Sequence, residues 1–374
     1  MYLILHRCRY VVSSYSPLKV LEDSSVVVDD GAIVCVGECR GYNGYDRIDC
    51  KERAAVPAFG NAHVHIHTIL KTLNNCDLYK ASLIAVLNMA ANGIAAFQSI
   101  DKDYSVVVKA AKAIGLRVRA GPIIAGDKSI QIEDVGHDLY TPIVSVENLL
   151  EIDEGLLEYH IHNLLNRNID VNISVSRTIE EALKFKREKG VFPIEYLAKK
   201  NLLSNKIMLS HINWVSSWEV ESIAYSRPRI VVCPYSDTLF GISGLPPIKP
   251  LLDRGVVIGI GTESFEHRYS SSMLSDIASI IALYRYSNTY IEIEQALDIA
   301  TQGSYRAMNI NAGAIDLGKE ADIALFNIRK MKYYPHFKQI PPLLLYESHV
   351  DATMVKGNMV WSIDEVDRYM RILL

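Results

Sequence analysis

The chain has 374 residues, of which 49% are hydrophobic and 22% charged, and this is enough apolar material for two ordinary domains or one large barrel with an appendage. Its formal net charge of −4, without a long run of lysine or arginine, argues against nucleic acid as a partner. No stretch reaches the roughly 18 uninterrupted apolar residues that span a bilayer, so a membrane is not expected as a partner either.

The first 55 residues have the composition of β-strands. The apolar run at residues 1–12 is broken by Arg7 and Arg9 and offers no small-residue cleavage site, so we predict a strand there and not a signal peptide. Further on, the turn sequence Asp29-Asp30-Gly31 separates two runs rich in valine and isoleucine, which is a strong hairpin signal. This opening segment is therefore expected to be all β.

From residue 56 to residue 317, short apolar strands alternate with helical stretches, a pattern typical of a parallel sheet with crossover helices. The strands are apolar almost throughout, as expected when both faces of a sheet are covered. The candidate strands are residues 60–66, 93–99, 117–124, 171–176, 207–212, 230–234 and 256–262. Helices are predicted at residues 104–114, 178–189 and 273–284, the last with Leu274, Ile277, Ile281 and Tyr284 on one face.

Seven candidate strands are thus found, and one strand is missing from the fourth place in the series. It is expected between residues 127 and 152. An eight-stranded (β/α)8 TIM-type barrel is the economical completion of the pattern. After Gly318 the chain returns to β texture, at residues 321–326 and 352–361. We therefore predict an α/β protein of two domains, a small composite β-sandwich from residues 1–55 and 318–374, and a barrel from residues 56–317.

Two histidines, His63 and His65, stand two residues apart at the end of the first predicted barrel strand. Side chains at i and i+2 of a strand face the same way, so both imidazoles can reach one metal ion. A second pair, His160 and His162, lies in a stretch with helical periodicity, where such side chains diverge. Only the first pair is therefore predicted to bind metal, and His67, beyond the expected end of the strand, is predicted to be a loop histidine.

Polar residues at the ends of other strands are candidates for further ligands, because the catalytic residues of a parallel barrel lie at the carboxyl ends of its strands. His211 follows the sixth predicted strand and Glu263 follows the eighth. Four potential ligands, His63, His65, His211 and Glu263, are thus expected on one face. Imidazole and carboxylate together suit a divalent transition metal ion, with zinc or iron favoured here.

These residues belong to a longer set of motifs that runs over nearly the whole chain. The set comprises the hairpin ending Val34-Cys35-Val36-Gly37, residues 57–65, Leu209-Ser210-His211, residues 233–237 and 244–255, Gly261-Thr262-Glu263 and residues 318–323. It resembles the amidohydrolase superfamily, in the branch of cytosine deaminases, chlorohydrolases and guanine-type deaminases. The resemblance implies a metal-dependent hydrolase that acts on a carbon–nitrogen bond of a small molecule.

The resemblance also implies roles for single residues. In that branch the strand-eight carboxylate, here Glu263 in place of the usual aspartate, takes a proton from water, and His211 steadies the oxygen or the leaving nitrogen. A histidine after strand five and a glutamate three residues later complete the family pattern. In this chain those two positions carry Ser174 and Arg177.

Arg177 changes the expected chemistry, because a permanently charged guanidinium cannot act as a general base and repels a nearby cation. One interpretation makes it a substrate-binding residue for a carboxylate or a developing oxyanion. The other pairs it with Glu180 or Glu181 on the following helix, and this is favoured because surface arginines at helix starts are common. For Glu263, the corresponding structural alternative is a pair with His267 or Arg268.

Three further positions, His137, Ser236 and Asp237, receive no single role from the sequence. His137 lies where strand four is expected to end, but no motif surrounds it. Ser236 and Asp237 follow strand seven, where they either shape the floor of the pocket or serve only the structure of a loop.

The function predicted from all of this is that of a deaminase or a hydrolase of cyclic amides or amidines, with a small molecule as substrate. The alternative is a barrel that has lost catalysis and persists as a ligand-binding or interaction protein. A third option uses Ser174 as a nucleophile with His211 as its base, provided that His211 binds no metal. Assembly into a homo-oligomer is left open.

The number and spacing of the cysteines indicate the cellular compartment in which the protein is expected. Six of them are spread thinly along the chain, at positions 8, 35, 39, 50, 76 and 233. Such spacing fits a reducing cytoplasm better than a disulfide framework. Cys35 and Cys39 flank a turn, but no second cysteine pair or nearby histidine completes a zinc site, so neither a redox nor a zinc role is predicted for them.

Overall fold

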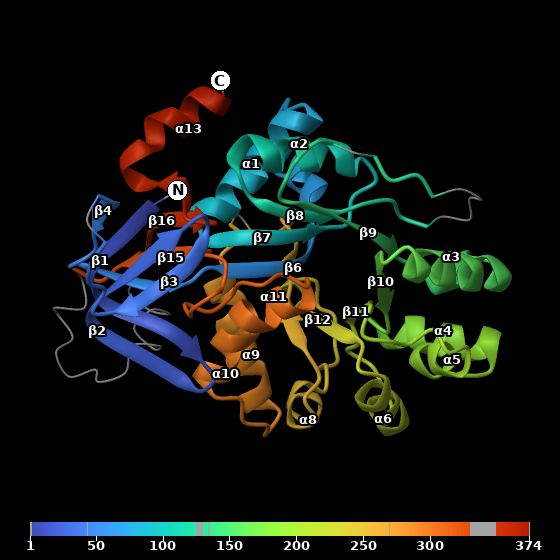
Figure 1. Cartoon of the computed structure of the whole chain (residues 1–374). Helices are drawn as coiled ribbons and strands as arrows, with labels where there is room; N and C mark the ends of the chain where they lie inside the picture. The colour runs from blue at the N-terminus through green and yellow to red at the C-terminus, as the bar shows by residue number, and fades with distance from the viewer. Residues whose placement is uncertain are drawn as a thin grey trace.

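The structure, a computed structural model, describes residues 2–42, 44–124, 130–133, 135–268, 270–329 and 349–373. Its strands form two sheets, one built from both ends of the chain and one from its middle (Figure 1). Within the described ranges, no helix is both long enough and apolar enough to cross a bilayer.

The first sheet has eight strands in the order β17-β16-β15-β5-β1-β2-β3, with β4 beside β1. Its members are β1 (Tyr2–Tyr15), β2 (Leu18–Asp29), β3 (Ala32–Gly37), β4 (Asp46–Asp49), β5 (Arg53–Pro57), β15 (Ile323–Asn327), β16 (His349–Val355) and β17 (Asn358–Ser362). The predicted hairpin is confirmed, because β2 pairs antiparallel with β3 and the connecting Asp30 and Gly31 have φ values of 45° and 78°. A two-residue turn of this kind requires positive φ at both positions.

The two ends of the chain meet where β15 pairs antiparallel with β5. Buried side chains from both ends, including Leu3, Leu5, Ile323 and Leu325, form one apolar cluster there. The sheet therefore agrees with the expected β appendage. β5 extends to Pro57, two residues past the predicted boundary at 55, and the domain limits themselves stay a prediction.

The second sheet is parallel throughout and closes on itself. Its strands are β6 (Phe59–His65), β7 (Ile94–Ser99), β8 (Arg117–Ala120), β9 (Tyr140–Val146), β10 (Asp170–Val175), β11 (Ile207–His211), β12 (Arg229–Val232), β13 (Ile258–Ile260) and β14 (Glu263–Ser264). β13 pairs with β12 and β14 pairs with β6, so these two short segments form the two halves of an eighth strand. The (β/α)8 barrel is confirmed, and β9 is the fourth strand that was expected between residues 127 and 152.

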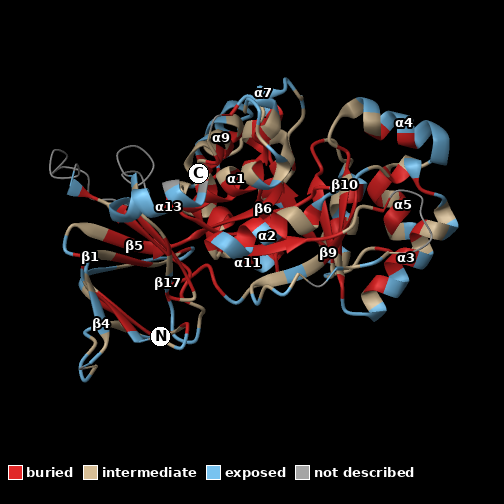
Figure 2. Ribbon diagram, turned by 90° about the horizontal axis from the view of Figure 1, so that it is seen from above, coloured by how far each residue is buried: buried red, intermediate tan, exposed pale blue. Residues whose placement is uncertain are grey.

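Helices surround the barrel strands, which are mostly buried, whereas the helices alternate buried and exposed residues (Figure 2). The helices are α1 (Leu78–Ala91), α2 (Tyr104–Ile114), α3 (Glu154–Asn166), α4 (Ile179–Lys189), α5 (Pro193–Lys199), α6 (Ser217–Ser226), α7 (Pro234–Leu239), α8 (Ile248–Asp253), α9 (Met273–Tyr286), α10 (Ile293–Asp298), α11 (Ser304–Ala307) and α13 (Val366–Leu373). Short non-α helical turns are η1 (Ile66–Lys71), η2 (Leu149–Glu151), η3 (Ile299–Gly303) and η5 (Ile363–Glu365).

The three predicted helices are confirmed as α2, α4 and α9. The buried face of α9 differs from the prediction, because Ile277 and Tyr284 are joined in the core by Met273 and Ile280, while Leu274 and Ile281 are only partly buried against it. The helical reading of the second histidine pair is also confirmed. Both residues lie on α3, where His160 is buried and His162 is exposed.

The expectation of no disulfide is wrong for one pair of cysteines. Cys35, on β3, and Cys39, just after it, form a disulfide. Gly37, which lies between them, has a φ of 113°, a value that glycine adopts without steric cost. The remaining cysteines, at positions 8, 50, 76 and 233, are free.

Candidate active site

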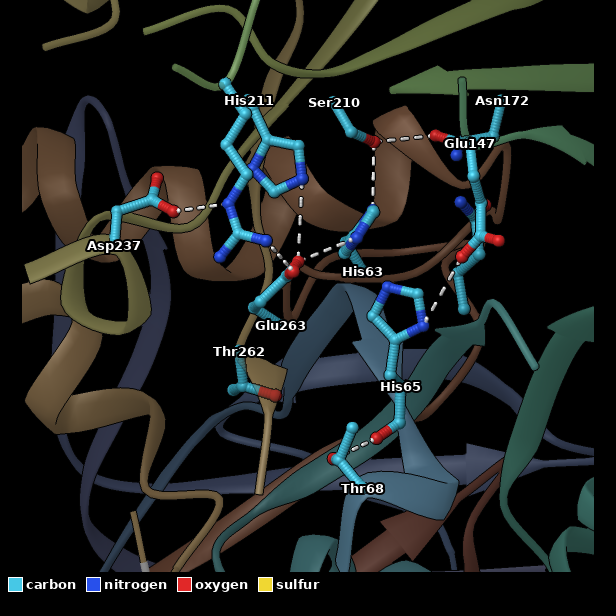
Figure 3. A network of polar contacts seen from close by, with 12 residues as sticks. His63, His65, Thr68, Glu147, Asn172, Ser210, His211, Asp237, Thr262 and Glu263 are labelled. Atoms are coloured by element: carbon cyan, nitrogen blue, oxygen red, sulfur yellow. Dashed lines mark hydrogen bonds and ion pairs between the residues drawn. The ribbon is translucent and has the colours of Figure 1, made fainter. Parts of the chain in front are cut away.

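Residues from three strand ends converge at the carboxyl-terminal rim of the barrel (Figure 3). His63 and His65 lie on β6, His211 ends β11 and Glu263 begins β14. The Nε2 atom of His63 lies 2.8 Å from Oε2 of Glu263, and Nε2 of His211 lies 3.5 Å from the same oxygen. The four residues predicted to meet on one face are thus brought together, with the Glu263 carboxylate at their centre.

Backbone geometry aims two of these side chains inward. His211 and Glu263 have φ values of 77° and 61°, in the left-handed region that residues other than glycine rarely adopt. Such strain is held in place by the surrounding fold and is concentrated at functional sites. Gly261 makes the arrangement feasible, since a Cβ atom there would lie 2.6 Å from the Cβ atom of His63.

A hydrogen-bonded chain fixes the orientation of His63. Its Nδ1 lies 2.9 Å from Oγ of Ser210, which donates to Oδ1 of Asn172 at 2.7 Å. With the Asn172 amide in this orientation, the Ser210 oxygen is left to accept a hydrogen bond from the N–H at Nδ1 of His63. The lone pair of His63 Nε2 then faces the Glu263 carboxylate, and neither Nε2 nor Oε2 has a hydrogen-bond partner.

The lone pairs of His63 Nε2 and Glu263 Oε2 repel each other in this buried site, and a cation bound by both atoms would remove that repulsion. The ligand atoms of His63, His65 and Glu263 all lie within 4.8 Å of one another, and so do those of His211, Cys233 and Glu263. Nitrogen and carboxylate donors of this kind suit a divalent transition metal. The donor set therefore fits such an ion, although the assignment of individual ligands stays a prediction. Cys233 was not predicted as a ligand, although it follows directly after strand seven and belongs to the motif at residues 233–237.

Arg177 points into this site and not along α4. Its Nη1 donates to Oε1 of Glu263 at 2.6 Å and its Nε donates to Oδ1 of Asp237 at 3.0 Å. The favoured expectation of a side-chain pair with Glu180 or Glu181 is wrong. The Glu181 carboxylate instead accepts the backbone N–H groups of Ser176 and Arg177 at the start of α4, so it needs no side-chain cation.

The alternative partners proposed for Glu263 are engaged elsewhere. Arg268 forms a buried pair with Asp276, and His267 lies 3.8 Å from Glu266. Asp237, on α7, is buried and accepts from Nδ2 of Asn213 as well as from Arg177. It is therefore part of the wall that holds Arg177 in place.

Burial sets the protonation of the central groups. It lowers the pKa of His211 to about 3, although the nearby Glu263 carboxylate opposes this shift. Burial alone would raise the pKa of Glu263, but attraction to protonated His211 and His63 opposes burial and the pKa lies well below its usual range. The permanently charged Arg177, 2.6 Å from Oε1, keeps a positive charge beside the carboxylate when His211 is neutral. Near neutral pH the site therefore combines an ionised carboxylate with a neutral imidazole at position 211.

Several predicted positions lie outside this cluster. His67 is in the helical turn η1, where its Nδ1 lies 3.5 Å from Asp101. His137 precedes β9 at the opposite end of the barrel, with Nε2 bonded to the Leu116 carbonyl oxygen at 2.9 Å. Ser174 is half-buried on β10 and has no side-chain hydrogen bond to a histidine among the described residues, which gives no support to a serine nucleophile.

One carboxylate at the rim was missed. Glu147 follows directly after β9, and its Oε1 lies 3.9 Å from Nδ1 of His65. Sequence reasoning did not find it because the fourth strand had not been located. A cavity of about 300 Å³ opens beside the cluster, and its lining includes His65, Thr68, Arg177, Phe240, Glu263 and Glu266.

Comparisons with known proteins agree on the fold and the family. A model described as "Amidohydrolase family" matches residues 54–360. A 5-methylthioadenosine/S-adenosylhomocysteine deaminase of Pyrococcus furiosus is 24% identical over an alignment of 380 positions, which covers 90% of this chain and 90% of that one. Two solved structures are similar in fold. An adenosine deaminase from Xanthomonas campestris with bound zinc has a TM-score of 0.86 at 19% identity, covering 99% of this chain and 96% of that one. An atrazine chlorohydrolase from Arthrobacter aurescens complexed with zinc has a TM-score of 0.85 at 16% identity, covering 99% of both chains.

Proposed function

The chain belongs to the amidohydrolase family, and from this membership we propose that it is a metal-dependent deaminase of small nitrogen heterocycles that carry an amino group. The broader class, an enzyme that hydrolyses a carbon–nitrogen bond of a small molecule, is common to the named deaminases among its relatives. The proposed substrate is an adenosine with a modified 5′ carbon, because that is the type of compound named for the Pyrococcus furiosus relative.

The observation that carries this proposal is the convergence of three imidazoles, those of His63, His65 and His211, on the Glu263 carboxylate. We assign these four residues as the ligands of one divalent ion and propose zinc as that ion. When bound, such an ion lowers the pKa of water and polarises the bond under attack. The proposal also includes the cytoplasm as the compartment, and a small molecule, rather than nucleic acid or a membrane, as the partner.

Deamination replaces an amino group by an oxygen and needs two proton transfers. Water adds to the carbon and loses one proton, and the leaving nitrogen gains a proton and departs as ammonia. The ionised Glu263 carboxylate is the acceptor of the first proton, through the oxygen that faces His63 and His211. His211, neutral and buried, would hold the ion through Nε2, so that nitrogen is not also available to hydrogen-bond the attacking oxygen.

The second proton needs another donor, because Arg177 occupies the position of the family's glutamate. We propose Glu147 for this role. It stands at the rim, with 43% of its side chain exposed, and its carboxylate approaches His65. Protons can reach it from solvent, and its Oε1 lies 3.9 Å from Nδ1 of His65, a residue that lines the cavity.

Arg177 takes a different part in the proposed site. It lines the cavity and holds Glu263 from the side opposite to His63. Because Asp237 anchors its Nε, the guanidinium fixes one carboxylate oxygen of Glu263 and leaves the other free to act. We propose that Arg177 positions Glu263 and contacts the substrate at the cavity wall.

The test combines metal analysis with ammonia release. Protein produced with added zinc is expected to hold about one zinc ion per chain and to release ammonia from adenosine or 5-methylthioadenosine. The His63→Ala variant is expected to lose both properties. The matched control, His162→Ala, replaces an exposed histidine on α3 and is expected to keep both.

A protein without zinc or ammonia release, but with measurable nucleoside binding by calorimetry, would instead support a ligand-binding role. The contact of 2.6 Å between Arg177 and Glu263 is the observation that favours this second candidate, since the guanidinium already supplies a cation to the carboxylate.

A further inference from the structure

A second polar cavity, of about 670 Å³, lies at the amino-terminal end of the barrel, opposite to the candidate active site. Residues at or next to the starts of the strands line it. Asp170 begins β10, Lys206 immediately precedes β11 and Arg229 begins β12. The cavity has the size of a small-molecule site, which is typically about 300–1,000 Å³.

Positive charge is concentrated in this cavity, although the chain as a whole has a net charge of −4. Six cationic side chains line it, namely Arg119, Arg167, Lys206, Arg227, Arg229 and Arg306. Asp170 is the one carboxylate among the described residues of the lining. The wall therefore carries five positive charges more than it carries negative ones.

The single carboxylate is already shared by two arginines. Asp170 Oδ2 lies 2.6 Å from Nη2 of Arg119 and 2.8 Å from Nη2 of Arg229. Arg119 is only 2% exposed, yet its Nε and Nη1 have no hydrogen-bond partner, and neither does Nε of Arg229. Burial lowers the pKa of Arg119 to about 10, although Asp170 opposes the shift. The buried part of the wall thus contains two positive charges, on Arg119 and Arg229, and only one negative charge, on Asp170.

The outer cations are not neutralised by ion pairs either. Arg167, Arg227 and Arg306 are exposed and Lys206 is half-buried. None of the four forms a salt bridge with a residue of the described chain, although Arg306 interacts electrostatically with Asp298 at longer range. Like charges gathered around one cavity repel one another, and an anion within the cavity removes that cost.

We propose that this cavity binds a small molecule with two or more phosphate groups. Guanidinium groups bind phosphate oxygens through paired N–H donors, which makes arginine the preferred residue for this chemistry. Several cations around one cavity match the several charges of a diphosphate or triphosphate better than they match a single monoanion. The size of the cavity leaves space for an organic group beside the phosphates.

Calorimetric titration of the full-length protein with inorganic triphosphate, at fixed ionic strength, tests this site. Sulfate and adenosine triphosphate are titrated in parallel, to separate simple anion binding from recognition of an organic phosphate. The double variant Arg227→Gln/Arg306→Gln removes two exposed cations without touching the buried pair. We expect it to bind triphosphate at least tenfold more weakly than the wild type. The control Arg368→Gln, which removes an exposed arginine of α13, is expected to bind like the wild type.

Two outcomes would overturn the proposal. One is triphosphate binding no tighter than sulfate binding, or equal in the double variant and the wild type. The other is tight binding of an RNA oligonucleotide with no binding of triphosphate, which would point to a macromolecular polyanion. Ammonia release is expected to be unchanged in the double variant, so this site stands or falls independently of the proposed deaminase activity.

Discussion

The replacement Arg177→Met is the sharpest perturbation of the candidate active site, because it removes one cation from between two buried carboxylates. The side chains of Glu263 and Asp237 are each 6% exposed, and that of Arg177 is 26% exposed. Removal of one partner from a buried pair costs about 3–5 kcal/mol. The partial exposure of Arg177 reduces this figure, so we expect the metal-free variant to lose about 2–3 kcal/mol in its free energy of unfolding.

Zinc is expected to reverse the loss. Without the guanidinium, the carboxylate of Glu263 interacts with a divalent ion alone, and repulsion between Arg177 and that ion disappears. The variant should therefore bind zinc more tightly than the wild type. An ion present at 100 times its dissociation constant stabilises the folded state by about 2.7 kcal/mol, which is enough to restore the stability of the variant.

The assay is urea unfolding of metal-depleted protein, with and without added zinc, together with calorimetric zinc titration. Arg254→Met is the matched control, since its exposed pair with Glu221 is expected to contribute less than about 1 kcal/mol. Equal stability of the metal-free variant and the wild type would refute the energetic argument. Equal zinc affinity in the two proteins would refute the claim that Arg177 and the ion compete for Glu263.

Three further predictions concern single side chains. Glu263→Gln keeps the size of the side chain but removes the proton acceptor, so the rate constant of ammonia release should fall by about 10²–10⁴-fold; a loss below threefold would exclude the assigned role. Glu147→Gln should lower the rate by about 10²-fold and flatten its dependence on pH, whereas an unchanged pH profile would leave proton delivery to another group. Burial raises the pKa of Asp298 from 3.8 to about 6, so its contribution to stability is full below the unfolded pKa and is lost as the pH rises through 6. In Asp298→Asn the free energy of unfolding should therefore change less between pH 4 and pH 7, by at most about 3 kcal/mol, and identical urea titrations would contradict this.

Most of the barrel was predictable because its strands are buried on both faces and therefore form continuous apolar runs. The fourth strand, β9, was the exception. It begins with Tyr140 and Thr141, and Pro142 follows in a position that normally argues against a strand. Once β9 is missed, Glu147 at its end is missed as well. The face of α9 was predicted only in part, because neighbouring elements decide which of several apolar residues are covered.

The sequence by itself determined the convergence of His63, His65, His211 and Glu263, because strand periodicity and parallel pairing place the ends of these strands on one rim. Only the tertiary structure decided what Arg177 does. From the sequence, its neighbours were the glutamates of the following helix, but those carboxylates are served by backbone N–H groups or lie in solvent. The buried charges of Glu263 and Asp237, 86 and 60 residues further along the chain, attract the guanidinium more strongly. Charge balance in a buried site depends on groups brought together from distant segments, and no local pattern encodes that.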